Sequence, residues 1–107
     1  MKDAVAIYEK LVGENPNFKG KGKTTSYTSS NGYMFSFVNK VNQIGIRLSK
    51  EDTTYFGTKY EIEPFISHGS KMREYVLISA DALKNDWNFV AEMLQKSFEY
   101  VNSLPSK

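Results

Sequence analysis

The chain has 107 residues, of which 40% are hydrophobic and 24% charged, and its formal net charge is +2. These values predict one globular domain over residues 1–107 and exclude an intrinsically disordered chain. Cysteine is absent, which excludes disulfide scaffolds, thiolate zinc sites and cysteine nucleophiles. The absence of cysteine also fits a reducing, cytoplasmic setting. No apolar run approaches the roughly 20 residues needed to cross a bilayer, so we expect a soluble protein without a membrane segment.

The first predicted element is an amphipathic helix that begins near Asp3. Its apolar residues recur at helical spacing, and stop signals follow at Gly13 and in the segment Asn15-Pro16-Asn17. A helix with one apolar stripe buries that stripe against the rest of the domain. The residues expected on the buried side are Ala4, Tyr8, Leu11 and Val12.

A β-meander is predicted over residues 24–48. Residues 24–28 are rich in β-branched side chains and form its first strand, and the Asn31-Gly32 pair is typical of a tight hairpin turn. The second strand covers residues 33–38, and a third strand follows a short polar loop. Because side chains alternate along a strand, the aromatic residues of the second strand are expected to share one face directed at the core. They are Tyr33, Phe35 and Phe37.

The third strand of the meander has one apolar face and one face that carries Gly45 and Arg47. The missing side chain of Gly45 leaves room for a neighbouring aromatic ring or for a bound molecule. The sequence leaves these two alternatives open. The residues of the apolar face are Ile44, Ile46 and Leu48.

A short helix is predicted after the meander. Residues 49–52 (Ser-Lys-Glu-Asp) resemble a capping box, which satisfies backbone N–H groups at the start of a helix. The helix is expected to run to about Tyr60, with Tyr55 and Phe56 on its buried side.

Two further strands are predicted. Pro64 cannot donate a ladder hydrogen bond, so residues 63–66 are expected to form an edge strand or an extended loop. A turn over residues 67–70 leads to a strand over residues 73–79, whose β-branched and aromatic side chains suit a half-buried sheet.

The C-terminal segment predicts a capped turn through Leu83 and then a long helix that restarts at Asn85 or Asp86. Its apolar stripe consists of Trp87, Val90, Ala91, Leu94, Phe98 and Val101. Core packing of this stripe is favoured over a stacking platform for single-stranded nucleic acid. Phe89 lies off the stripe and is predicted to be exposed, where it would mark a partner contact.

The predicted order of elements is helix, three strands, helix, two strands, helix. This order indicates an α+β domain, α-β(3)-α-β(2)-α, whose antiparallel sheet carries the helices on one face. The other face of the sheet is then either exposed to solvent or used for binding.

One candidate ligand site combines the meander with the final strand. If the third and final strands are neighbours, Arg47 and Arg73, with Lys71 close in the sequence to Arg73, would form an anion-binding patch near Gly45, Tyr27 and Tyr33. The favoured alternative is that Arg47 pairs with Glu74 across the two strands. The residues of the candidate site are Tyr27, Tyr33, Gly45, Arg47 and Arg73.

A basic loop is a candidate for weak nucleic-acid binding. Lys19, Lys21 and Lys23 alternate with glycine, so a flexible backbone would bring three cations to phosphate groups. A solvated connector is the favoured interpretation, because basic, glycine-rich loops are common. Nucleic acid is therefore not the expected partner.

Candidate catalytic or metal-binding groups are few. His68 is the single histidine of the chain, which excludes a multi-histidine metal site, and its place in a turn favours a structural role over catalysis. Glu61 and Glu63, with Asp52 or Glu74, would form an acid–base pair or hold a divalent cation. An acidic sheet edge that opposes aggregation is the favoured interpretation of this pair, so we expect neither a metal nor a cofactor.

Short sequence words spread over nearly the whole chain resemble the TfoX N-terminal domain family, in the form of a short single-domain subgroup. The matching words are Lys23-Thr24, Tyr27-Thr28-Ser29-x-Asn31-Gly32-x-Met34-Phe35-Ser36-Phe37, Ile46-Arg47-Leu48, Gly69-x-x-Met72-x-Glu74-Tyr75-Val76 and Ser97-x-x-Tyr100-Val101-x-Ser103-Leu104-Pro105. The chain departs from the namesake at residues 26–29, where Ser-Tyr-Thr-Ser replaces a Met-Phe-Gly-Gly word.

The resemblance implies a two-layer fold similar to secretion chaperones and YjbR-like proteins. The family's namesake regulates natural competence in bacteria and has a second, C-terminal domain that these 107 residues do not contain. The family supplies no catalytic residues that could be assigned to positions of this chain.

The sequence as a whole favours a non-enzymatic binding or regulatory domain. Its expected partner is another protein or a second copy of the chain, bound through the open sheet face or an edge strand. A small-molecule or anion pocket is one alternative, and weak nucleic-acid binding is another. An enzyme is not expected, because no set of nucleophile, base and orienting group is visible.

Overall fold

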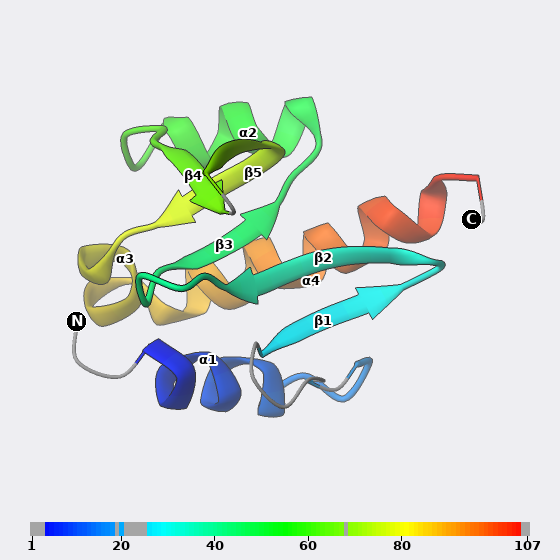
Figure 1. Ribbon diagram of the computed structural model, residues 1–107, viewed down its shortest axis with the longest axis horizontal. Coiled ribbons are helices and arrows are strands. Elements are labelled where there is room, and N and C mark those ends of the chain that lie inside the picture. Colours follow the sequence, from blue (N-terminus) through cyan, green and yellow to red (C-terminus); the bar gives the residue numbers. More distant parts are fainter. Residues whose placement is uncertain (1–3, 19, 21–25, 68, 106–107) are drawn as a thin grey trace.

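An antiparallel sheet with helices packed on one face forms the fold (Figure 1). The computed structural model describes residues 4–18, 20, 26–67 and 69–105, and within them the sheet has five strands in the order β1-β2-β3-β5-β4. The strands are β1 (Tyr27–Ser30), β2 (Tyr33–Val38), β3 (Ile44–Arg47), β4 (Pro64–Ser67) and β5 (Ser70–Ile78). The helices are α1 (Ala4–Gly13), α2 (Lys50–Gly57), α3 (Ala80–Asn85) and α4 (Trp87–Ser103).

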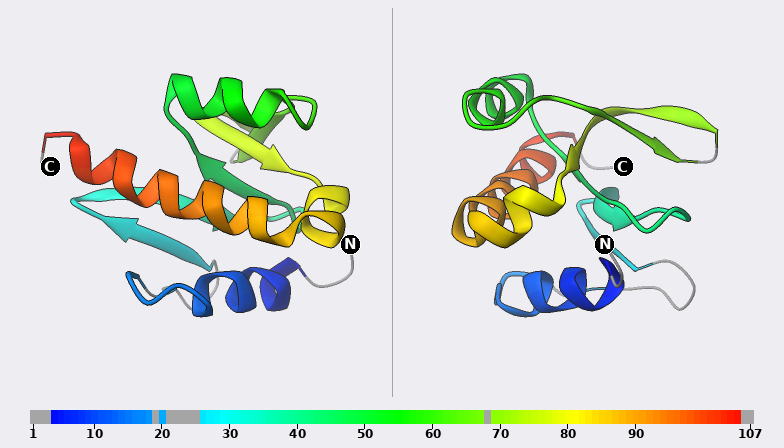
Figure 2. Two further views of the ribbon diagram at one scale, coloured as in Figure 1. Left: turned by 180° about the vertical axis from the view of Figure 1, so that it is seen from behind. Right: turned by 90° about the vertical axis from the view of Figure 1, so that its left-hand side faces the viewer.

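The predicted α+β class and its one-sided helical layer are confirmed. All four helices contribute side chains to one hydrophobic cluster, which also contains the apolar face of β3. Figure 2 shows the helices together on one side of the sheet. The β4 strand is at the edge of the sheet, as Pro64 predicted.

Local capping chemistry sets several element boundaries as predicted. Asn31 and Gly32 have φ angles of 57° and 84° in the turn between β1 and β2. The Ser49 hydroxyl accepts a hydrogen bond from the Asp52 backbone N–H at 3.1 Å and so caps α2. The Ser79 hydroxyl caps α3 in the same way. These groups satisfy backbone donors that a helix end would otherwise leave without partners.

Several predicted boundaries change. The first strand runs from Tyr27 to Ser30 instead of over residues 24–28, and residues 24 and 25 lie outside the described part of the chain. Helix α2 ends at Gly57 instead of Tyr60. Tyr55 is 38% exposed, so Phe56 is the residue that anchors the buried side of α2. The final strand is longer than predicted and begins at Ser70.

A β-bulge in β2 corrects the prediction that its three aromatic residues share a face. Thr28 is opposite Ser36 while the next residue, Ser29, is opposite Met34, so Phe35 has no direct partner on β1. An extra residue on one strand interrupts the alternation of side chains. Phe35 therefore packs in the main cluster under the helices, and Phe37 packs on the opposite face.

The sheet curls so that β4 covers part of its own second face. Phe65 of β4 contacts Phe37 of β2, with ring centroids 5.0 Å apart, although β3 and β5 lie between these strands. A flat sheet would separate the strands by about 14 Å. The bend coincides with a register irregularity between β4 and β5 and with Glu74, whose φ is +68°. Phe37, Phe65 and Tyr75 form a second aromatic cluster there.

Phe89 is buried, which corrects the prediction that it is exposed. Its exposed fraction is 4%, and its ring stacks on Phe56 at 5.8 Å and on Tyr60 at 6.0 Å. The sequence pattern of α4 alone could not show that α2 covers this side of the helix. Trp87 is only partly buried, and its indole N–H donates to Glu14 at 2.7 Å.

Buried hydroxyl groups join α1 to the bulged strand. The Tyr8 hydroxyl lies 2.6 Å from the Ser36 hydroxyl, which also bonds the hydroxyl of Thr28. Burial raises the pKa of Tyr8 to about 12, although the hydrogen bonds to Ser36 and Thr28 oppose this shift. Because burying a polar group is costly unless it is hydrogen-bonded, this chain of hydroxyls favours one position of α1 on the sheet.

Candidate functional site

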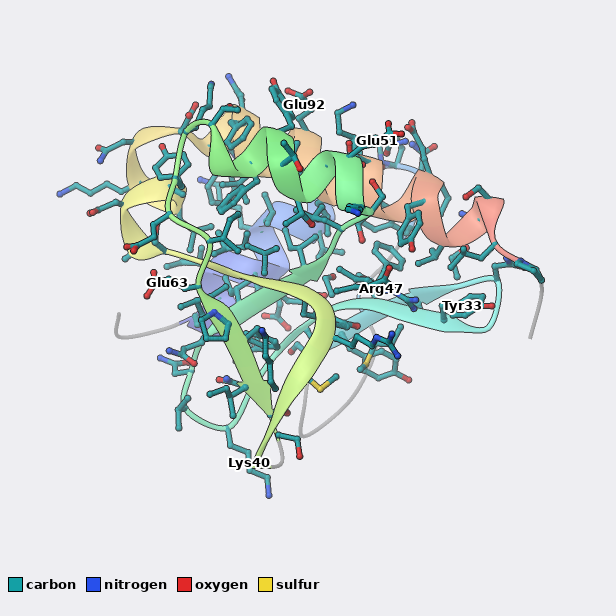
Figure 3. The ribbon with its side chains drawn as sticks, turned by 90° about the horizontal axis from the view of Figure 1, so that it is seen from above. Tyr33, Lys40, Arg47, Glu51, Glu63 and Glu92 are labelled. Atoms are coloured by element: carbon teal, nitrogen blue, oxygen red, sulfur yellow. The ribbon has the colours of Figure 1, made fainter. Side chains whose placement is uncertain are left out.

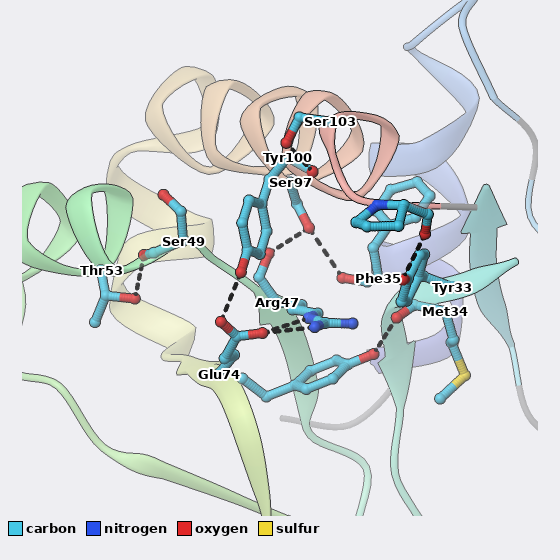
Figure 4. A network of polar contacts seen from close by, with 12 residues as sticks. Tyr33, Met34, Phe35, Arg47, Ser49, Thr53, Glu74, Ser97, Tyr100 and Ser103 are labelled. Atoms are coloured by element: carbon cyan, nitrogen blue, oxygen red, sulfur yellow. Dashed lines mark hydrogen bonds and ion pairs between the residues drawn. The ribbon is translucent and has the colours of Figure 1, made fainter. Parts of the chain in front are cut away.

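Arg47 is the centre of a polar network at the junction of β3, β5 and α4 (Figure 4). Its Nε and Nη2 donate to Oε1 of Glu74 at 2.8 and 2.6 Å, and the Tyr100 hydroxyl donates to Oε2 of Glu74 at 2.6 Å. The guanidinium carbon lies 5.3 Å from the ring centroid of Tyr33 and 5.7 Å from that of Tyr100. A cation at these distances from the two rings is stabilised by their π-electron density.

The structure shows the Arg47–Glu74 ion pair, the alternative that the sequence favoured. Of the candidate site residues, Tyr33 and Arg47 come together. Tyr27 packs instead against the second aromatic cluster, and Arg73 is exposed on β5. The space beside Gly45 holds the Phe65 ring, which is the aromatic alternative of the two open at that position.

The remaining sequence candidates form no site in the described structure. Lys19, Lys21, Lys23 and His68 lie outside the described residues. Glu61 and Glu63 are exposed before β4. Within the described ranges there is no group of three or more acidic, histidine or cysteine side chains that could hold a metal ion.

The charge of Glu74 is stabilised by its neighbours. Burial by itself would raise the pKa of Glu74, but hydrogen bonds from Tyr100 and Arg47 and the charges of Arg47 and Arg73 lower it below the ordinary value of 4.5. The same hydrogen bond raises the pKa of Tyr100, because the neutral phenol is the donor. Both shifts favour the arrangement in which an ionised Glu74 connects β5 to α4.

The Glu74 network predicts an acid-dependent loss of stability. A lowered pKa in the folded state stabilises the protein above the unfolded value of 4.5, and this contribution disappears as the pH falls below it. We expect the free energy of unfolding of the wild type to decline towards that of Glu74→Gln over this range, by less than about 1 kcal/mol because the pair is partly exposed. Denaturant titrations at several pH values test this. Parallel pH profiles for the two proteins would contradict it.

A second candidate site is the loop between β2 and β3, which Asn39 holds in a defined shape. The side-chain oxygen of Asn39 accepts from the backbone N–H groups of Val41 and Gln43 at 3.1 and 2.9 Å. Its amide nitrogen donates to Oε1 of Gln43 at 3.0 Å and to the carbonyl of Ile66 at 2.9 Å. Asn39 is 8% exposed, so one buried amide fastens the loop to the tip of the β4–β5 hairpin.

Two large apolar side chains are exposed where the loop meets the hairpin. Val41 is 70% exposed and Ile66 is 51% exposed. Together with polar neighbours they line an open hollow of about 490 Å³, which we call the loop–hairpin groove. The lining residues of this groove are Asn39, Lys40, Val41, Gln43, Ile66, Ser67 and Gly69.

A second, smaller hollow of about 280 Å³ borders the same loop. Val41 lines both hollows, and the second one continues to Ile78 at the end of β5 and Ala80 at the start of α3. The loop is also joined to α1, because the side-chain oxygen of Asn42 accepts from the Ala4 backbone N–H at 3.3 Å. Val41 is thus an apolar projection on a braced loop between two depressions.

The edge of β4 is protected against pairing with another strand. Pro64 has no N–H to donate, and the carbonyl of Ile66 already accepts from Asn39. Proline and local capping at an edge are common means of preventing strand addition. Contacts at this end of the molecule would therefore be made mainly by side chains.

The sequence matches no protein-family model and no curated protein. Within the described residues, no helix combines the length and the apolar character that crossing a membrane requires.

Proposed function

We propose that this chain is a non-enzymatic protein-binding domain that contacts its partner through the loop–hairpin groove. The observation that carries the proposal is the 70% exposure of Val41 on a loop held by Asn39. An apolar side chain on a braced loop binds with little loss of conformational entropy, because the loop is already ordered. Ile66 extends the apolar surface across the groove.

The groove is a better candidate than the second face of the sheet. Phe37, Phe65 and Tyr75 already bury part of that face by packing against one another, with centroid distances between 5.0 and 5.9 Å. Edge pairing is also disfavoured by Pro64. Side-chain docking at the groove is the mode of binding that remains open at this end of the molecule.

The resemblance to the TfoX N-terminal domain family supports a regulatory role in the cytoplasm. A domain that acts by binding another protein needs an accessible contact surface and no catalytic group. The matching words around Ile46-Arg47-Leu48 and Glu74-Tyr75 fall at the junction that bends β5, which brings the hairpin to the loop. The shared words would on this proposal maintain the geometry of the groove.

Replacement of Val41 tests the proposed contact. We expect Val41→Gln to reduce capture of a partner from the source cell by about tenfold, because a central apolar anchor contributes about 1–3 kcal/mol. Quantitative mass spectrometry of proteins retained by the immobilised domain measures this. Met34→Gln is the matched control, since Met34 is 36% exposed on β2 and does not line the groove. If both variants retain the same proteins as the wild type, the groove is not the contact surface.

A further inference from the structure

Two lysines flank the apolar part of the loop–hairpin groove. Lys40 lines the groove directly. Lys71 is the cross-strand partner of Ile66, and directly opposed residues of an antiparallel pair project from the same face. Both lysines are exposed, and neither forms an ion pair with a described residue.

Among the described residues, no acidic side chain lines the groove. Figure 3 shows Glu51 and Glu92 on the helical layer, whereas Lys40 extends from the opposite side of the molecule. The two ion pairs between described residues, Arg47–Glu74 and Lys59–Asp86, include none of the groove-lining residues. The groove therefore presents an apolar centre with a positively charged rim.

From this arrangement we infer that the partner is a protein segment with an exposed apolar anchor flanked by aspartate or glutamate. The inference rests on the proposed function and specifies the chemistry of the partner. The anchor would contact Val41 and Ile66, and its acidic neighbours would lie against Lys40 and Lys71. Complementary rim charges mainly accelerate association and exclude wrong partners, while the desolvated apolar centre supplies most of the affinity.

A second copy of this chain fits the groove less well. In a two-fold symmetric dimer the same patch faces itself, so the four lysines of two copies would gather around one contact. Like charges brought together at an interface are unfavourable. Glu61 and Glu63, the acidic residues that precede β4 in the chain, lie before the start of this strand. Lys40 lines the groove together with Ser67, which is at the other end of the same strand.

The test uses a random peptide library displayed on phage and selected against the full chain. Selected peptides should be enriched in acidic residues around an aliphatic or aromatic residue. For one synthetic selected peptide, Lys40→Glu with Lys71→Glu should weaken binding about tenfold, and added salt should weaken binding to the wild type. Lys50→Glu on α2 is the charge control and should leave the affinity unchanged.

Each result separates the two proposals. Loss of binding in Val41→Gln together with no effect of the lysine reversals would overturn the acidic partner but leave the groove as contact surface. Selected peptides that are basic or uncharged would also overturn the acidic partner and leave the groove as the contact surface. A library that yields no peptide dependent on Val41 would overturn both proposals. A concentration-dependent dimer abolished by Val41→Gln, seen by analytical ultracentrifugation, would show that a second copy is the occupant instead.

Discussion

The Gly45→Ala variant is expected to be less stable than the wild type by about 2–3 kcal/mol. A Cβ atom at Gly45 would lie 2.4 Å from two ring carbons of Phe65, far closer than atoms approach in packed interiors. The ring cannot move away freely, because it also packs against Phe37 and Tyr75. The lower conformational entropy of unfolded alanine offsets less than about 1 kcal/mol of this cost. Urea unfolding followed by circular dichroism measures the difference.

A double-mutant cycle identifies the Phe65 ring as the cause. Phe65→Ala alone should lose about 3–4 kcal/mol, because a fully buried ring is removed. In that background Gly45→Ala should cost nothing or stabilise slightly, since the added methyl group enters the vacated space. The two changes would then show a coupling energy of at least about 2 kcal/mol. Strictly additive losses would mean that Phe65 does not lie over Gly45.

Elements whose boundaries depend on neighbours in the sequence were predictable. Asn31-Gly32 places the hairpin turn because these residues readily adopt positive φ angles, and Ser49 and Ser79 cap their helices through hydrogen bonds to residues three positions later. The edge position of β4 follows from the missing N–H of Pro64. Each of these interactions is local, so the sequence contains all of its participants.

Features that depend on distant residues could not be predicted from pattern alone. Phe37 faces the opposite side of the sheet from Phe35 because β2 contains a bulge, and the pairing of β2 with β1 sets the position of that bulge. The ring over Gly45 comes from β4, a strand that is not the neighbour of β3 in the sheet, and the bend that brings it there coincides with Glu74 of β5. The alternation of side chains placed Phe37 on the wrong face, because it assumes a regular strand without a bulge. It also left open whether an aromatic ring or a bound molecule lies beside Gly45, because it carries no information about how the sheet bends.

One candidate site could be proposed from the sequence, and the other could not. Arg47 and Glu74 could be proposed as a pair because both were expected on strands, on the condition that these two strands are neighbours, and the structure meets that condition. The groove was missed, although Val41 is a lone apolar residue within the polar segment 39–43. Its significance depends on the hydrogen bond from Asn39 to the Ile66 carbonyl, which joins segments 27 positions apart. A single apolar residue in a polar loop is a usable signal only when such a brace is known.

The Phe89→Ala variant is expected to lose about 3–4 kcal/mol of stability. The ring is 4% exposed and lies between α2 and the rest of α4, where Phe56 stacks on it with an interplanar angle of 11°. Removing a buried aromatic ring loses its transfer free energy and leaves a cavity. Thermal unfolding and urea titrations measure the loss. A change within about 0.5 kcal/mol is typical of exposed positions and would contradict the buried placement.

The Phe89→Ala substitution should destabilise α2 more than the rest of the domain, which distinguishes the loss of this ring from a general loss of packing. Helix α2 has eight residues and buries one of them, Phe56, so its attachment depends largely on the contact with Phe89. Isolated helices of this length are marginal in water. Hydrogen exchange in Phe89→Ala should therefore accelerate in α2 more than in β2 or β3. Tyr55→Ala is the matched control, because Tyr55 touches the same ring at 5.4 Å but is 38% exposed and should leave the α2 amides largely protected.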